Sequence, residues 1–180
     1  MKRLILWLAS ILILTACSST RPTQYYQLPD SAFRLPENKV QPIAVKVILA
    51  EPLKNNGLVY QTDVHTVHFA QNHLWAAPLE HSLAAVFANK FNRIGNHSFA
   101  PATHHLNTNG TLLIYLDRFQ GRHTGDTEIS GYAIWQNQHQ QKPISRQSFH
   151  VITPQTGDGY TAMIQSLDKG LNQVVTQLIP

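Results

Sequence analysis

The most reactive side chain in this sequence is the thiol of Cys17, because no other cysteine occurs among the 180 residues. Lys2 and Arg3 give the chain a positive start, and the stretch from Leu4 to Leu14 is almost entirely apolar. Such a stretch is too short to span a bilayer, which takes about 20 apolar residues. It has the length of the hydrophobic region of a secretory signal peptide. The sequence therefore predicts a signal peptide over residues 1–16, followed directly by Cys17.

The four residues Leu14-Thr15-Ala16-Cys17 resemble the lipobox of bacterial lipoproteins. The resemblance implies that the Cys17 sulfur is diacylated, that cleavage falls between Ala16 and Cys17, and that the new amino group is then acylated. One acyl chain holds a protein only marginally, whereas three chains on one residue would form a lasting anchor. An Asp after the cysteine usually signals retention at the inner membrane. Ser18 stands there, so we expect the outer membrane, with the protein facing the periplasm. The alternative is an ordinary signal peptide with a chance cysteine.

Ten histidines raise the question of a metal site. His65 and His68 are three residues apart in an expected strand, where they would point to opposite faces and could not chelate one ion together. His104 and His105 are adjacent in an expected loop, with no cysteine or nearby carboxylate to complete a site. We therefore expect structural or solvated histidines, no metal, and no cofactor other than the covalent lipid on Cys17.

Motifs of catalysis are equally scarce. The sequence has neither a G-x-S-x-G nucleophile elbow nor a glycine-rich phosphate loop. Ser130 and Ser148 lie within strand patterns, which are poor places for an exposed nucleophile. Asp117 and Asp126 flank a strand end and a turn, where strand-edge charge is a simpler interpretation than a catalytic pair. We expect no catalytic residues and no enzymatic activity, and any ATP hydrolysis would belong to another subunit.

The composition restricts the kinds of partner. Without residues 1–16 the chain is still long enough for one domain with a full core. Two of its basic residues, Lys2 and Arg3, belong to the expected signal peptide, and basic and acidic residues are nearly balanced in the remainder. No basic run remains that would follow the phosphates of a nucleic acid. Charged residues make up only 13% of the chain. Contacts with partners would thus depend less on charge than on shape and hydrogen bonding, and nucleic acid is not an expected partner.

Strands are predicted where apolar and β-branched residues gather between turn signals. Ile43 to Leu49 is β-branched and bounded by Pro42 and Pro52, which predicts a strand. The polar stretch over residues 100–110 predicts a loop. Further strands are expected over residues 58–61, 64–69, 111–120, 128–137 and 143–153.

Two amphipathic helices are predicted. One begins near Pro78 and ends at Gly95, because apolar residues recur at every fourth position from Leu79. The other extends from Tyr160 to Leu178 and is weakened only by Gly170. The resulting order, β-β-β-α-(β)-β-β-β-α, predicts a single α+β domain in which both helices pack on a mainly antiparallel sheet.

The segment L-W-A-A-P-L from Leu74 to Leu79 resembles the ABC-type transport auxiliary lipoprotein family. Members of that family commonly carry a lipobox, a Tyr-x-Leu segment and, before a leucine-spaced helix, a segment like R-W-A-E-P-L. Here Ala77 replaces the acidic residue, and His73-Leu74 replaces the basic one. The positions that match are Trp75, Ala76, Pro78, Leu79, Tyr26-Gln27-Leu28, Leu116-Asp117-Arg118-Phe119 and Gly131-Tyr132-Ala133-Ile134-Trp135. The resemblance covers nearly the whole chain after the signal peptide.

This resemblance implies a role in moving lipids across the periplasm. Inner-membrane proteins with MCE domains form hexameric rings and tubes in such systems, and the auxiliary lipoprotein docks their far end at the outer membrane. Residues 17–35 would form the lipidated tether and the segment leading into the fold, and residues 36–180 the family domain. Trp75, Pro78 and Leu79 are candidate residues for contact with a partner. For Trp75 and Pro78, simple packing at the start of the helix is the alternative.

Two classes of function therefore remain open. The first is a non-enzymatic docking subunit of an MCE-type lipid transport system, with an MCE-domain protein as partner and a homo-oligomeric ring as its own assembly. The second is a stand-alone, periplasm-facing lipid-binding or chaperone-like lipoprotein that shields one ligand in a pocket. For assembly, the expected strand over residues 111–120 offers an alternative edge to the segment around Trp75.

Overall fold

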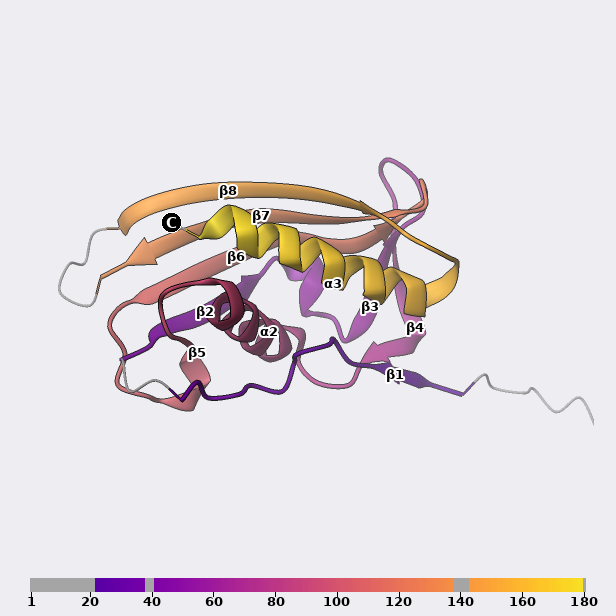
Figure 1. Ribbon diagram of the computed structural model, residues 1–180. Coiled ribbons are helices and arrows are strands. Elements are labelled where there is room, and N and C mark those ends of the chain that lie inside the picture. The colour runs from indigo at the N-terminus through magenta and orange to yellow at the C-terminus, as the bar shows by residue number, and fades with distance from the viewer. Residues whose placement is uncertain (1–21, 38–40, 138–142, 180) are drawn as a thin grey trace, which may run out of the picture.

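The computed structural model describes residues 22–37, 41–137 and 143–179, so the predicted signal peptide and Cys17 lie outside it. In these ranges eight strands form one sheet, and two α-helices lie together on one of its faces (Figure 1). None of the helices in this part of the chain is both long and apolar enough to cross a membrane. The elements are β1 (Gln24–Tyr26), β2 (Ile43–Leu49), the 3-10 helix η2 (Glu51–Lys54), β3 (Gly57–Gln61), β4 (Val67–Trp75), α2 (Leu79–Ile94), β5 (Phe99–Pro101), the 3-10 helix η3 (Ala102–His104), β6 (Thr111–Arg122), β7 (Asp126–Gln136), β8 (Pro143–Pro154) and α3 (Gly159–Leu178).

The predicted α+β class with two packed helices is confirmed. The two longest ladders, β6–β7 and β7–β8, are antiparallel, as expected. The sheet is nevertheless mixed, because β1 pairs with β4 in parallel, β2 with both β5 and β6, and β3 with β6. These parallel pairs join segments that are distant in sequence, so the short connections along the chain gave no sign of them.

Strand β6 lies inside the sheet and not at its edge. β7 pairs along one side of β6, and β2 and β3 follow one another along the other side. Between these two strands the chain leaves the ladder to form η2. The expectation that residues 111–120 could serve as an edge for assembly was therefore wrong, because both sides of this strand already carry a ladder.

Helix α3 packs on β7 and β8 as part of the core. Leu167 and Leu171 are fully buried. A Cβ added at Gly170 would lie 2.9 Å from Cδ1 of Ile129 and 3.0 Å from Oγ1 of Thr153. The glycine that weakened the helix prediction therefore allows the helix to approach the sheet closely.

The segment after β1 is fastened to helix α2. The amide of Asn89 donates hydrogen bonds to the backbone carbonyls of Asp30 (2.8 Å) and Ala32 (2.9 Å), and its oxygen accepts one from the backbone N–H of Arg34 (3.0 Å). Arg93 Nη2 lies 2.6 Å from Asp30 Oδ2, and this hydrogen bond lowers the pKa of Asp30. The structure thus includes residues 24–35, which the sequence assigned to the tether and leading segment, in the folded domain.

Lys90 of α2 connects this region with α3. Its side chain is only 3% exposed, and its Nζ lies 2.8 Å from Asp168 Oδ1 and 2.7 Å from Asn172 Oδ1. A lysine so deeply buried needs such partners, because an unpaired charge would be costly there. The two helices and the segment after β1 therefore form one packed layer.

Candidate functional site

The segment that carries the family resemblance begins where β4 ends. Trp75 is 7% exposed, and its ring centroid lies 6.0 Å from that of Phe119. Leu79 is 5% exposed, whereas Pro78 is exposed. The indole of Trp75 is thus not available for contact with a partner, because it is buried in the core together with Leu79. Of the three candidate contact residues, only Pro78 presents its side chain at the surface.

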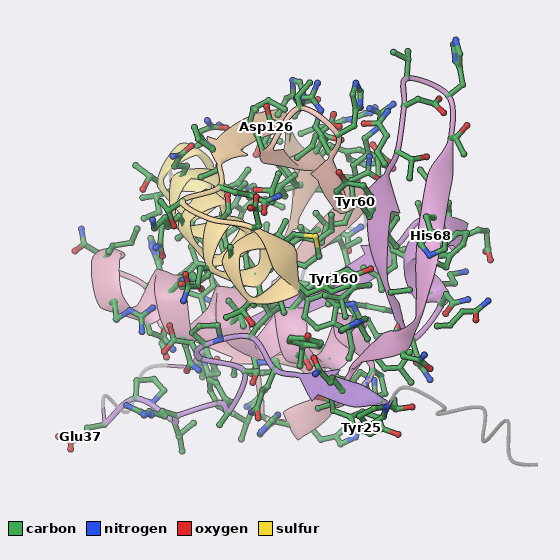
Figure 2. The ribbon with its side chains drawn as sticks, turned by 90° about the vertical axis from the view of Figure 1, so that its right-hand side faces the viewer. Tyr25, Glu37, Tyr60, His68, Asp126 and Tyr160 are labelled. Carbon is green, nitrogen blue, oxygen red and sulfur yellow. The ribbon has the colours of Figure 1, made fainter. Side chains whose placement is uncertain are left out.

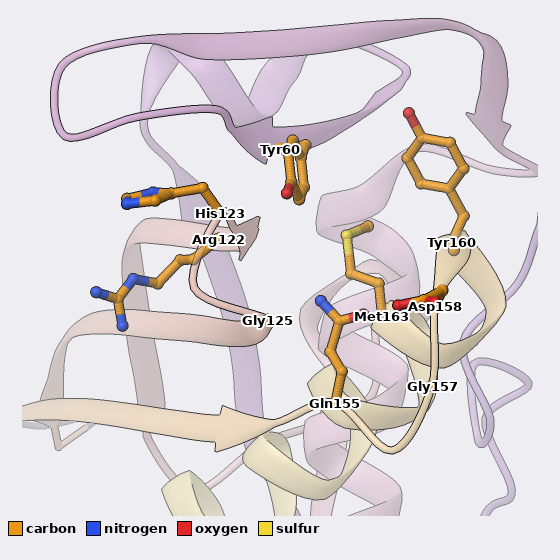
Figure 3. A pocket seen from close by; sticks show the side chains of 10 residues that line it. Tyr60, Arg122, His123, Gly125, Gln155, Gly157, Asp158, Tyr160 and Met163 are labelled. Carbon is orange, nitrogen blue, oxygen red and sulfur yellow. The ribbon is translucent and has the colours of Figure 1, made fainter.

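A half-open cavity of about 550 Å³ lies at the end of the molecule where β1 and α3 begin. We call this end, at the right in Figure 1, the tether end. The cavity is bounded by β3, the turn between β6 and β7, the loop from β8 to α3, and the first turn of α3 (Figure 3). Its lining residues are Tyr60, Arg122, His123, Gly125, Gln155, Gly157, Asp158, Gly159, Tyr160 and Met163.

Glycines shape this cavity. A Cβ added at Gly121 would lie 2.6 Å from Sδ of Met163 and 2.9 Å from Cδ2 of Tyr60, so the bare backbone lets both side chains pack against β6. Gly125 and Gly159 have φ angles of 80° and 86°. Residues with a side chain rarely adopt this conformation. The two turns at the cavity mouth therefore depend on glycine.

The aromatic wall of the cavity is tied to β1. The ring centroid of Tyr160 lies 4.1 Å from that of His73 and 6.2 Å from that of Tyr26. The Tyr26 hydroxyl is hydrogen-bonded to Nδ1 of His73 at 2.9 Å. Burial raises the pKa of the Tyr160 hydroxyl. Tyr60 and Tyr160 both lie on the tether end, which faces the viewer in Figure 2.

Charged groups line the other side of the cavity. Arg122 Nη1 lies 3.1 Å from Asp126 Oδ1, and its Nε lies 4.0 Å from Glu128 Oε2. Glu128 is buried. Its Oε2 lies 3.1 Å from Nη1 of Arg118, and its Oε1 lies 3.0 Å from Nε2 of His150. These contacts form a charge network that ties together β6, β7 and β8.

The two aspartates considered for catalysis are not brought into one site. Asp126 is engaged by Arg122 and accepts a hydrogen bond from Thr124. Asp117 is exposed at the irregular point of the β6–β7 ladder, between Leu116 and Arg118. Asp126 is thus an ion-pairing residue at a turn, and Asp117 is an exposed residue at a bulge.

The histidine pairs are also placed apart. His65 lies in the turn before β4, and His68 is exposed on that strand. His104 ends η3, and His105 follows it with φ at 50°. Across residues 22–37, 41–137 and 143–179, no three His, Cys, Asp or Glu side chains come together as metal ligands.

The sheet face opposite the helices forms a second surface. The rings of Tyr115 and Tyr132 stack there with centroids 4.6 Å apart, and Cζ of Arg146 lies 4.2 Å from the Tyr132 centroid. Both tyrosines are half-buried, and Arg146 is exposed. This face is suited to contact with another macromolecule, since half-buried aromatics and arginine are enriched in interfaces.

The sequence patterns did not predict the cavity. Tyr160 was expected only as the first residue of the last helix. The available signal was the cluster Gly157-Asp158-Gly159 directly before that helix, because two glycines around an aspartate indicate a sharp turn. Periodicity alone could not show that Tyr60, far earlier in the chain, faces the same space.

Comparison with known proteins agrees with the resemblance. Residues 26–179 match the sequence model of the ABC-type transport auxiliary lipoprotein component. The chain is 32% identical over 170 residues to the intermembrane transport lipoprotein PqiC of Escherichia coli K12, covering 89% of this chain and 88% of the relative. The PqiC protein of Shigella flexneri matches with the same identity and coverage.

Solved structures show the same fold. A crystal structure of an uncharacterized protein matches with a TM-score of 0.68 and 29% identity, over 87% of this chain and 95% of its own. A second crystal structure, of a protein from Xanthomonas campestris, matches with a TM-score of 0.65 and 18% identity, over 86% and 92%. Because both the sequence match and the fold extend over nearly all the described residues, the chain belongs to the ABC-type transport auxiliary lipoprotein family.

Proposed function

We propose that this chain is the outer-membrane-anchored lipoprotein subunit of a Pqi-like, MCE-type intermembrane lipid transport system. The observation that carries the proposal is its similarity to the intermembrane transport lipoprotein PqiC along almost the entire length of both chains. The L-T-A-C segment at Leu14–Cys17 supports the anchor. In this role the domain docks the far end of a PqiB-like MCE-domain assembly at the outer membrane and faces the periplasm.

The strand edges of the domain support assembly into a ring. In the described part of the chain, β8 pairs only with β7, and β4 meets β1 only at its last three residues. Exposed strand edges are templates for pairing with another chain. An edge formed by β8 differs from one formed by β4, so contact between them in neighbouring copies is heterologous, and such contacts close into rings when the rotation allows.

The soluble domain, residues 18–180, is expected to self-associate and to bind the periplasmic region of the MCE partner. Light scattering on each protein and on the mixture measures both. Val67→Lys places a charge on the free part of the β4 edge and is expected to weaken self-association. Leu106→Lys is the matched control, because Leu106 is 39% and Val67 41% exposed. A domain that stays monomeric at high concentration and does not bind the periplasmic region of the MCE partner would contradict the proposal.

The second candidate, a lone lipid carrier, is favoured by one observation, the cavity at the tether end. A carrier that shields a ligand without a partner purifies as a monomer with stoichiometric lipid. A docking subunit retains an MCE-domain protein. The two functions are therefore separated by what remains bound after extraction from the membrane.

A further inference from the structure

The cavity at the tether end lies close to the membrane if Cys17 carries the proposed lipid. Gln24 is the first residue of β1 and follows Cys17 by seven positions. A fully extended chain of that length spans roughly 25 Å. Tyr26 of the same strand is linked through His73 to Tyr160 in the cavity wall. The anchor therefore holds the cavity within reach of the lipid headgroups.

The cavity carries opposite charges on its two sides. Figure 3 shows Arg122 and His123 on one side and Asp158 and Tyr160 on the other, with Tyr60 and Met163 between them. Nη1 of Arg122 lies 3.1 Å from Asp126 Oδ1, and its Nε lies 4.0 Å from Glu128 Oε2. A guanidinium has five N–H donors, so these two contacts do not exhaust its capacity to bind an anion.

Each part of this lining suits one part of a zwitterion. Arginine binds phosphate oxygens through charge-assisted hydrogen bonds. The faces of tyrosine rings attract ammonium groups, and the Asp158 carboxylate adds an opposite charge on the same side. The thioether of Met163 and the ring of Tyr60 offer apolar surface between the two charged ends. A phosphate joined to an ammonium by a short linker therefore matches the lining.

The volume of the cavity limits what can enter. At about 550 Å³, it has the usual size of a small-molecule site. Because the cavity is half open and held beside the bilayer, a headgroup can enter while its acyl chains remain in the membrane.

We propose that the cavity binds the zwitterionic headgroup of a membrane phospholipid, with the phosphate at Arg122 and His123 and the ammonium at Tyr160 and Asp158. This inference rests on the proposed lipid anchor, which brings the cavity to the headgroups. It adds to the docking role a site on this subunit that touches lipid directly.

Native mass spectrometry of the full lipidated protein, released from detergent, tests the proposal. Phosphatidylethanolamine and phosphatidylglycerol with the same acyl chains are titrated separately, and one-to-one complexes are counted. Phosphatidylethanolamine is expected to bind at least about tenfold more tightly, because it alone supplies an ammonium. Soluble phosphoethanolamine is the third ligand, and is expected to compete with phosphatidylethanolamine, because it presents the same phosphate and ammonium. Equal binding of the two lipids, or no competition by phosphoethanolamine, overturns the assignment to a zwitterionic headgroup.

Two conservative variants address the ammonium side. Asp158→Asn removes the charge, and Tyr160→Leu keeps apolar volume but removes the ring face. Each is expected to lower the affinity for phosphatidylethanolamine about tenfold and to leave phosphatidylglycerol unchanged. Asp117→Asn and Tyr132→Leu make the same changes far from the cavity and are the matched controls. Unchanged phosphatidylethanolamine binding in both cavity variants, with melting temperatures near that of the wild type, overturns the site.

Failure of this site can be told apart from failure of the docking role. The Asp158→Asn variant is expected to retain the MCE-domain protein, because docking does not require the cavity. A protein that captures the partner but forms no lipid complex overturns the headgroup site and leaves the docking role standing.

Discussion

Replacing Cys17 with serine is expected to abolish fatty-acid labelling and to leave the chain as an uncleaved or mislocalised precursor. The sulfur of Cys17 is the proposed acyl acceptor. A serine hydroxyl keeps nearly the same size but lacks a thiol's capacity to ionise into a strong nucleophile. Without acylation the signal region stays attached, and only its short hydrophobic stretch, Leu4–Leu14, holds the chain at the membrane.

Growth with a radioactive fatty acid, followed by capture of the protein, measures this effect. Ser18→Ala is the control, because it changes the neighbouring residue and keeps the acyl acceptor. Label is expected in the wild type and in the control, together with the shorter, cleaved chain. Equal label in Cys17→Ser and the wild type would remove Cys17 as the anchor.

Replacing Leu167 with alanine is expected to lower the free energy of unfolding by roughly 2–5 kcal/mol, the usual cost for a fully buried leucine. Leu167 is 0% exposed and lies on the face of α3 that meets the sheet. The substitution removes apolar contacts and leaves a cavity between α3 and β7 and β8. A loss of this size is a large part of the stability of a single domain.

Urea denaturation of residues 18–180 gives the free energies for comparison. Leu106→Ala is the control, because it removes the same atoms from an exposed loop position. Its effect on the free energy of unfolding is expected to be small, as is usual for surface substitutions. If Leu167→Ala unfolds at the same urea concentration as the wild type, α3 does not contribute to the core.

The elements that sequence predicted well are those with long, regular apolar patterns. Both helices and the strands β2, β3, β4, β6, β7 and β8 follow from such patterns, since burial of one face is a local property of the chain. The three-residue strand β5 was missed because Phe99–Pro101 is too short for a pattern and ends in proline. β4 is longer than expected and continues to Trp75, since its polar residues lie on exposed or half-buried positions.

Long-range pairing was beyond the reach of local patterns. Whether β2 pairs with its neighbours in sequence or with β6 depends on contacts that form only in the folded chain. The same limit applies to Trp75. Its position before a helix predicts neither burial nor exposure. In the folded chain its indole packs near the ring of Phe119, which comes from a distant part of the sequence.

The same difference between local and long-range signals applies to the candidate site. Cys17 was proposed as the lipidated residue because the lipobox-like segment is a local signal, and it stays a prediction, since it lies outside the residues that the structure describes. The cavity could not be predicted from local patterns, because its lining residues Tyr60, Arg122 and Tyr160 come from three parts of the chain. Only the fold brings these residues together, at the end of the molecule where β1 and α3 begin.

Capture of the full lipidated protein from solubilised membranes distinguishes a docking subunit from a lone lipid carrier. Mass spectrometry identifies the proteins and lipids that remain bound after washing, and Cys17→Ser serves as the unanchored control. We expect an MCE-domain protein to be retained with the wild type, and the wild type to be recovered from outer-membrane fractions. Recovery of the wild type as a monomer with stoichiometric lipid and no MCE-domain protein would contradict the docking role and favour the lone carrier.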